Sequence, residues 1–319
     1  MLAWFNTRAV HVELSSKCTL KCPRCPRTEL AQDSLNREFS LAEFAQAFPL
    51  SDLAHIERLI FCGDLGDPIY ATEFLDICKY IKQTDCRLVI VTNGSYRKQS
   101  WWRELGTILT AQDQVTFSVD GWDQQSNEQY RVNCDFASIV SGIQTLRQTS
   151  TCLIVWSAIY FAFNEDRMIN IQSLAQSLGV DCFQTVRSSK FGGRYSVNGL
   201  DPLQPRQVAA TAQYEKSLQS FTGRLPITAN YSNSAHAWAR CLRHEKELLI
   251  TAAGLVLPCP WFNSGYQQNS FVSQHSERLN IKTRSLNTIL ADTVWQELWD
   301  SFDNEPLPVC KIKCKAADE

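Results

Sequence analysis

Short apolar segments that resemble strands alternate with amphipathic segments that resemble helices six times in the first 190 residues. The strand-like segments, such as "RLVIVTNG" at 87–94, are rich in β-branched residues and apolar enough to be covered on both faces. This pattern is typical of parallel strands, because crossover helices bury both faces of a parallel sheet. It predicts an α/β fold, and doubly wound and barrel arrangements both fit it. Strands are expected at 9–15, 57–63, 87–94, 114–121, 152–161 and 181–188.

The helices between these strands are expected at 40–48, 71–83, 100–109, 136–148 and 168–179. Ser40 is the expected N-cap of the first helix. After about residue 190 the rhythm changes, because "SKFGGRYSVNGLDPLQP" carries glycine and proline and is typical of a linker. The elements predicted beyond it are a helix at 205–221, a hairpin of "ELLIT" and "LVLPC" turned at Ala-Gly, and a helix at 288–301.

Cysteine is frequent, with 13 in 319 residues, and Cys18, Cys22 and Cys25 lie within eight positions. The N-terminal sequence lacks the pattern of a signal peptide, and no apolar run of about 18 residues is long enough to span a membrane. We therefore expect a cytoplasmic protein whose cysteines serve metal binding or catalysis rather than disulfides. Six cysteines are scattered singly and are interpreted as buried apolar residues, namely Cys62, Cys78, Cys86, Cys134, Cys152 and Cys182.

The three clustered cysteines are one ligand short of a closed zinc site, which takes four. Three thiolates can instead hold three irons of a cubane cluster and leave the fourth iron open to another molecule. A partial zinc site or a chance loop remains the alternative for this motif alone. The spacing Cys-x3-Cys-x2-Cys in "CTLKCPRC" resembles the signature of the radical SAM enzymes.

The resemblance to this family implies a partial (β/α)6 TIM-like barrel at 1–190, with a [4Fe-4S] cluster on Cys18, Cys22 and Cys25. It implies that the open iron binds S-adenosylmethionine (SAM), which is reductively cleaved to a 5′-deoxyadenosyl radical that abstracts a substrate hydrogen. An external electron donor similar to flavodoxin or ferredoxin is implied as a partner. Active sites of such barrels gather at the C-terminal ends of the strands, where the cysteine loop and three further distinctive segments fall.

Two of those segments resemble SAM-binding segments of the family. "GDLGDP" resembles its Gly-Gly-Glu-Pro segment, which implies that Gly66, Asp67 and Pro68 bind the SAM amino group. Asp replaces Glu here, which puts a side-chain contact in doubt and leaves the backbone carbonyls; a Gly-Pro turn with a capping Asp also fits. "FSVDG" implies that Ser118 contacts the SAM ribose, and Asp120 is a further candidate, although Asp-Gly is also typical of a plain turn.

"YR" at 130–131 resembles the Tyr-Arg of relatives that modify peptides and proteins. It implies that Arg131 pairs with the SAM carboxylate through its two-donor fork, and a surface arginine is the alternative. Asn93, in "TNG", is interpreted as a turn residue rather than a contact. The candidates for a general base near strand ends are Asp67, Asp120, Tyr160 and Glu165.

A second cysteine group consists of Cys241, Cys259, Cys310 and Cys314. Its spacing around the predicted hairpin resembles the auxiliary-cluster extension called SPASM, or its shorter form called twitch. The resemblance implies a linker and helix at 191–234 and a small α+β domain at 235–319 with one closed [4Fe-4S] cluster, which would relay an electron. Structural zinc on the same four thiols is the alternative.

The expected substrate is a peptide or protein, or a small molecule, that is oxidised or modified. A radical SAM alcohol dehydrogenase is one alternative, and a non-catalytic zinc-binding structural protein is another. The net charge of −2 and the absence of a basic run disfavour a nucleic-acid substrate.

Overall fold

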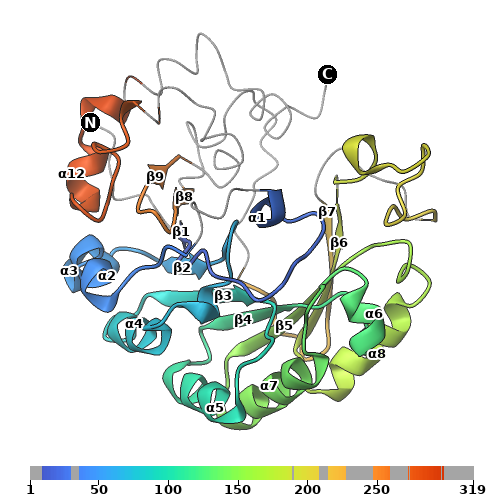
Figure 1. Ribbon diagram of the computed structural model, residues 1–319. Coiled ribbons are helices and arrows are strands. Elements are labelled where there is room, and N and C mark those ends of the chain that lie inside the picture. The colour runs from blue at the N-terminus through green and yellow to red at the C-terminus, as the bar shows by residue number, and fades with distance from the viewer. Residues whose placement is uncertain are drawn as a thin grey trace. The chain divides into compact units, whose positions relative to one another are not determined.

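The computed structural model divides into two compact units. Figure 1 shows the helices and strands of the chain, coloured by residue number. The first comprises Met1–Lys17, Ala31–Leu88 and Thr228–Glu319, and the second comprises Cys18–Leu30 and Val89–Ile227. Within the described ranges, no helix has both the length and the apolar character needed to cross a bilayer. The residues that the structure describes are 9–29, 36–188, 190–207, 215–227, 247–258, 272, 274–295 and 297.

A mixed sheet in the order β7-β6-β5-β4-β3 forms the framework of the second unit. Four of its strands run parallel, namely β3 (Arg87–Thr92), β4 (Gln114–Ser118), β5 (Leu153–Ile159) and β6 (Cys182–Arg187). The fifth, β7 (Glu215–Ser220), pairs antiparallel with β6. The parallel strands are mostly buried, as expected for strands joined by helical crossovers.

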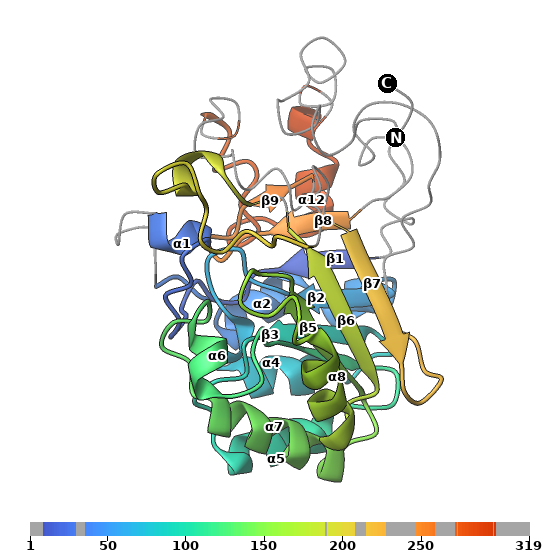
Figure 2. The ribbon, with the colours of Figure 1, turned by 90° about the vertical axis from the view of Figure 1, so that its right-hand side faces the viewer.

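Three helices of the second unit lie along one face of this sheet, namely α5 (Gln99–Ile108), α7 (Phe136–Thr149) and α8 (Met168–Ser177) (Figure 2). Trp102 of α5 is fully buried and its ring lies 5.2 Å from that of Phe117 on β4. Short helices that the sequence did not predict are α1 (Pro26–Glu29), α6 (Gln124–Glu128) and η4 (Gly193–Tyr195).

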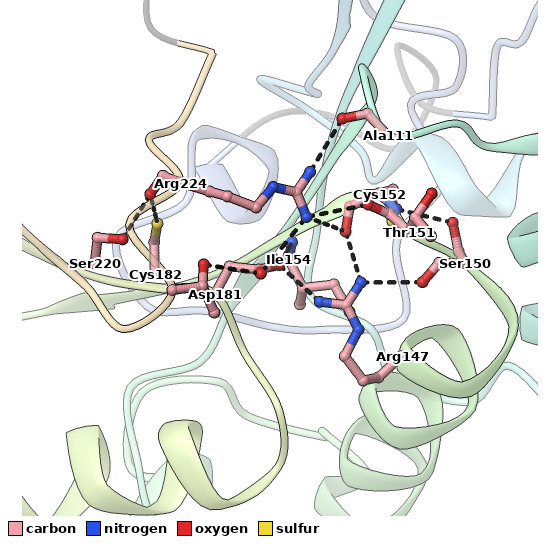
Figure 3. Close-up of polar contacts among 11 residues, drawn as sticks. Ala111, Arg147, Ser150, Thr151, Cys152, Ile154, Asp181, Cys182, Ser220 and Arg224 are labelled. Atoms are coloured by element: carbon pink, nitrogen blue, oxygen red, sulfur yellow. Dashed lines mark hydrogen bonds and ion pairs between the residues drawn. The ribbon is translucent and has the colours of Figure 1, made fainter.

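A polar network lies at the start of β6, around the buried carboxylate of Asp181 (Figure 3). Asp181 accepts hydrogen bonds from Arg147 Nη1 and from the backbone N–H of Ile154, both at 2.8 Å. Arg224, beyond β7, lies 3.5 Å from the same carboxylate. These contacts tie α7, β5 and the segment after β7 together at the N-terminal end of the strands.

In the first unit, β1 (Ala9–Val12) pairs parallel with both β2 (Arg58–Phe61) and β8 (Glu247–Ile250). The short β9 (Val256–Leu257) returns antiparallel to β8, turned at Gly254, whose φ of 90° suits glycine. The helices of this unit are α2 (Leu41–Ala47), α3 (Leu50–Leu53), η3 (Pro68–Tyr70), α4 (Phe74–Ile81) and α12 (Leu286–Leu290). A capping box of Ser40 and Glu43 opens α2, which confirms Ser40 as its N-cap.

The six strands and five helices predicted for residues 1–190 are confirmed within a few residues, as is the hairpin in the last third. The predicted helix at 205–221 is wrong at 215–220, where β7 forms instead. Its backbone pairs with β6 over the whole of Cys182–Arg187, and this long-range ladder overrides a locally helical composition. Helix 288–301 is confirmed in part by α12, and its end lies outside the described residues.

Candidate functional site

The loop of Cys18, Cys22 and Cys25 belongs to the second unit, and α1 follows it directly. A turn closes between the last two cysteines, since the N–H of Cys25 donates to the carbonyl of Cys22 at 3.1 Å. All three side chains pack in one apolar cluster with Leu20, Tyr130, Cys134 and Phe161. The fold therefore brings the three predicted ligands into one cluster with the aromatic side chains of Tyr130 and Phe161.

Polar groups in this cluster are directed at the sulfurs. Cys18 Sγ accepts from the backbone N–H of Leu20 at 3.4 Å and from Asn93 Nδ2 at 3.7 Å. Burial raises the pKa of Cys22 to about 11, and the neighbouring Arg131 guanidinium, which hydrogen-bonds to the thiol, opposes that rise. Asn93 also accepts from the N–H of Ser95, so it is both the predicted turn residue and a cysteine contact.

The two other charged candidates of the second unit form a buried ion pair. Arg131 Nε donates to Asp120 Oδ2 at 2.6 Å, and the Asp120 side chain is fully buried. Burial disfavours the charge of Arg131, but the Asp120 carboxylate, together with Cys22 and Tyr130, outweighs this effect, and the arginine pKa is raised. The ion pair uses the Nε atom of a guanidinium that also hydrogen-bonds to Cys22, so one side chain joins Asp120 to the cysteine loop.

Asp120 also positions backbone at the strand ends. Its Oδ1 accepts from the N–H of Ile159 at 2.7 Å, at the end of β5. Asn127 Oδ1 accepts from the N–H groups of Asp120 and Gly121, and Asn164 Nδ2 donates to the carbonyl of Asp120. The Asp-Gly turn is thus hydrogen-bonded to Asn127, Ile159 and Asn164, whereas a plain turn needs no such partners.

Ser118 ends β4, half-buried, with its backbone opposite Ser157 of β5. Tyr160 and Glu165, two of the general-base candidates, lie after β5. Tyr160 follows β5, and its N–H donates to the carbonyl of Val186. The carboxylate of Glu165 is engaged by the backbone N–H groups of Arg206 and Gln207 at 2.8 to 3.0 Å.

The segment Gly63–Pro68 lies in the first unit, where it packs against the backbone just after β1. Gly66 has no room for a side chain, since a Cβ would lie 2.0 Å from the carbonyl oxygen of Ser15. Asp67 is buried and caps η3, accepting from the N–H of Ile69 at 3.2 Å. The Asp67 side chain therefore caps η3, as in the alternative of a Gly-Pro turn with a capping Asp, and a ligand contact of this segment stays a prediction.

Glu13, at the end of β1, is a buried carboxylate that the sequence did not single out. It accepts from the N–H of Leu65 at 2.6 Å and from the N–H of Ala252 at 3.1 Å. Burial raises its pKa to about 7 against the opposing effect of these two donors. Glu13 thereby joins the Gly63–Pro68 segment to the turn of the β8–β9 hairpin.

The remaining cysteines separate into two groups. Cys78, Cys86, Cys134, Cys152 and Cys182 are buried as predicted, and Cys62 is half-buried. The second predicted ligand group lies outside the described residues, namely Cys241, Cys259, Cys310 and Cys314.

Two solved structures align with nearly the whole of this chain. Streptococcus suis SuiB bound to S-adenosylmethionine aligns with a TM-score of 0.61 and 13% identity, over 96% of this chain and 71% of SuiB. The native protein anSMEcpe with bound AdoMet and Cp18Cys peptide aligns with a TM-score of 0.55 and 12% identity, over 91% of this chain and 81% of that chain. This chain has the radical SAM fold. The α/β class and partial barrel expected from the sequence are thereby confirmed.

Sequence comparison finds a match over only part of the chain. No family model matches the chain. The tungsten-containing aldehyde ferredoxin oxidoreductase cofactor-modifying protein of Pyrococcus furiosus is 26% identical over 115 residues. That match covers 35% of this chain and 30% of the relative, so the chain matches less than a third of that protein. A further SuiB structure, bound to precursor peptide SuiA, aligns over 89% of this chain and 64% of that chain, with a TM-score of 0.58 and 13% identity.

In the radical SAM fold the first cysteine group fits an iron–sulfur cluster by its chemistry. It offers three thiols on one short loop, with N–H donors directed at Cys18 and a guanidinium beside Cys22. Donors of this kind stabilise anionic sulfur ligands. Across the described ranges, no three His, Cys, Asp or Glu side chains converge on one point for a single metal ion. Cysteines that bind separate irons do not need such convergence.

Proposed function

We propose that the chain is a radical SAM enzyme whose Cys18, Cys22 and Cys25 hold a [4Fe-4S] cluster. The observation that supports this most strongly is the meeting, in the second unit, of the cysteine loop with the ends of β3 and β4. Asn93 donates to Cys18, and Arg131, held by Asp120, hydrogen-bonds to Cys22. When reduced, such a cluster supplies the electron that cleaves SAM to methionine and a 5′-deoxyadenosyl radical able to abstract a substrate hydrogen.

The residues of this chain have binding and orienting roles in the proposal. Arg131 binds the SAM carboxylate through its guanidinium while Asp120 fixes its orientation. The half-buried hydroxyl of Ser118 serves the ribose. In the first unit, the backbone of Gly66, Asp67 and Pro68 serves the amino group. Tyr130, Phe161 and their neighbours keep water away from the cysteines, which a reactive radical requires.

We further propose that the substrate is a peptide or protein. SuiB has been crystallised with its precursor peptide SuiA and anSMEcpe with the Cp18Cys peptide, and this chain aligns with both. Cys241, Cys259, Cys310 and Cys314 are proposed to hold an auxiliary [4Fe-4S] cluster that takes up a second electron, so that the substrate is oxidised. An external flavodoxin- or ferredoxin-like protein is the proposed electron donor.

The test is anaerobic reconstitution with iron and sulfide, followed by dithionite and SAM. We expect about eight irons per chain and release of 5′-deoxyadenosine, detected by mass spectrometry. A Cys18→Ala/Cys22→Ala/Cys25→Ala variant is expected to lose about four irons and all deoxyadenosine. A Cys241→Ala/Cys259→Ala/Cys310→Ala/Cys314→Ala variant is expected to lose about four irons and keep deoxyadenosine formation.

Two outcomes would contradict the proposal. Uptake of zinc without iron would favour a structural metal protein. Full iron loading of the wild type without deoxyadenosine, also in the presence of a peptide substrate, would show that the SAM contacts are assigned wrongly. If deoxyadenosine forms but only small alcohols are oxidised, the peptide substrate is wrong and the radical chemistry stands.

A further inference from the structure

Residues 190–207, here called the cover, contact the cysteine loop through a buried ion pair. Arg24, which lies between Cys22 and Cys25, has its Nη2 atom 2.5 Å from Asp201 Oδ1 of the cover. The two side chains are only 6% and 0% exposed. The Arg24 guanidinium also stacks on Tyr195 of the cover, 3.8 Å from the ring centroid. Two independent contacts therefore fasten the cover to the loop that carries the cysteines.

Asp201 also organises the cover itself. Its Oδ2 accepts from the N–H of Gly192 at 2.8 Å, and its Oδ1 accepts from the N–H of Leu203 at 3.0 Å. Both ends of the cover thus close around one carboxylate. A loss of this charge would release Arg24 and loosen the fold of the cover at the same time.

The cover lies against the apolar cluster of the cysteines. Phe191 and Leu203 pack on this cluster, as Cys18 and Cys25 do. Phe191 meets Phe161 edge to face, with 6.0 Å between ring centroids. The side chains on this part of the cover are therefore among those that separate the cysteines from solvent.

The attachment of the cover is sensitive to substitution of either residue of the ion pair. Removing one partner of a buried pair is costly, because the other is left charged and unpaired. Among the described residues, Arg24 pairs with Asp201 through Nη2, and its buried Nε has no hydrogen-bond partner. Changing either residue therefore breaks the ion pair and leaves the charge of the other buried and unpaired.

We propose that Arg24 and Asp201 form a latch that holds the cover on the cysteine loop, and so positions that loop and shields its metal centre. The role of the latch in shielding a metal centre rests on the proposed [4Fe-4S] cluster. The contacts of the latch do not, because they are made by this chain alone. Arg24 and Asp201 are positioning residues, since they act through the loop and through Phe191 and Leu203.

The first measurement uses the full chain without iron. Trypsin has exposed target residues in the cover at Lys190, Arg194 and Arg206. In Asp201→Asn we expect cleavage at these residues about tenfold faster than in wild type, equivalent to about 1.4 kcal/mol lost from closure of the cover. Peptide mass spectrometry identifies the cleaved bonds.

Asp181→Asn is the matched control, because Asp181 is also a buried carboxylate paired with arginine (Figure 3). It precedes β6, whereas the cover follows that strand, so trypsin should cut the cover of this variant at the wild-type rate. Equal cleavage of the cover in Asp201→Asn and Asp181→Asn would overturn the latch.

The second measurement uses the reconstituted protein. From equal starting iron and sulfide, we expect the Asp201→Asn cluster to lose its visible absorbance in air about tenfold faster than that of wild type or Asp181→Asn. The electron paramagnetic resonance spectrum of its reduced cluster should also shift, because a positive charge beside the loop becomes unpaired. If the wild type binds no iron, the proposed function fails, and the trypsin result still decides the latch.

The double variant Arg24→Met/Asp201→Asn keeps the test decisive if the single variant does not fold, because it leaves no unpaired charge. If the two residues act as one unit, trypsin cuts the cover of the double variant no faster than that of Asp201→Asn. The single variant Arg24→Met is measured beside them. A double variant that is cut at the product of the two single effects, or at the wild-type rate, would contradict the latch.

Discussion

At the scale of single residues, Asp120 joins two parts of the candidate site through its two carboxylate oxygens. One oxygen takes the guanidinium of Arg131, and the other takes the N–H of Ile159 at the end of β5. A neutral amide at this position keeps an acceptor but removes the countercharge. Arg131 would then stay largely buried without its countercharge, and its side chain could turn away from a ligand.

We therefore expect Asp120→Asn to lower the free energy of unfolding by roughly 3 kcal/mol, as for a broken buried pair. We also expect it to weaken SAM binding to the reconstituted protein about tenfold, measured by calorimetry. Asp113→Asn is the control, because Asp113 is equally buried but caps the turn before β4. It should lose stability in urea without losing SAM affinity, and equal loss of affinity in both variants would refute the role of Asp120.

Sequence reasoning found Asp120 and Arg131 because both lie in short motifs with known neighbours. Asn93 was assigned to its turn because the local pattern "TNG" already explains it, and its contact with Cys18 joins residues 75 positions apart. Glu13 follows a strand-like segment that alternates apolar and polar residues, and nothing in this local pattern indicates that its carboxylate is buried. Its donors, Leu65 and Ala252, are distant in sequence and are not marked by any motif.

At the scale of elements, Glu13 links β1, the turn after β2 and the β8–β9 hairpin. Its pKa is about 7 in the folded protein, against an ordinary value of 4.5. Between these values the folded protein holds a proton that the unfolded chain releases, so stability falls as the pH rises through this window.

For the difference in unfolding free energy between wild type and Glu13→Gln, we expect a fall of up to roughly 3 kcal/mol from pH 4.5 to pH 7.5. Urea titrations followed by tryptophan fluorescence measure it. The control is Glu43→Gln, since Glu43 in the capping box of α2 is held below its ordinary pKa by hydrogen bonds that outweigh its burial. Its contribution is lost only as the pH falls below this window, so a flat difference is expected there. A flat difference for Glu13→Gln as well would contradict its burial as a protonated acid.

The sequence predicts helices and strands correctly where the spacing of apolar residues and the length of the segment both indicate the same element, as in α7 and the parallel strands. It failed at β7, whose residues "EKSLQS" suit a helix about as well as a strand. The deciding contacts are remote: β7 pairs with β6, and the turn after it returns to Asp181 through Phe221 and Thr222. Local propensity carries no information on either contact.

At the scale of the whole molecule, residues from both ends of the chain build the first unit. β8 supplies the second neighbour of β1, so a chain that ends at residue 246 would leave one edge of β1 unpaired. Such an edge is a template for aggregation. We expect the 1–246 chain to elute as aggregates in size-exclusion chromatography, whereas a 1–297 chain, which keeps β8 and β9, stays dispersed. A monomeric 1–246 chain would show that β1 does not need this partner.

The pairing of Ala9 with Glu247 also has a consequence in time. Roughly 240 residues separate the partners, so a ribosome adding 5–20 residues per second needs roughly ten to fifty seconds between them. The second unit ends at Ile227 and is complete before β8 emerges. During synthesis β1 therefore keeps one open edge after the second unit is complete, and we expect chaperones to matter most to the nascent chain in this interval.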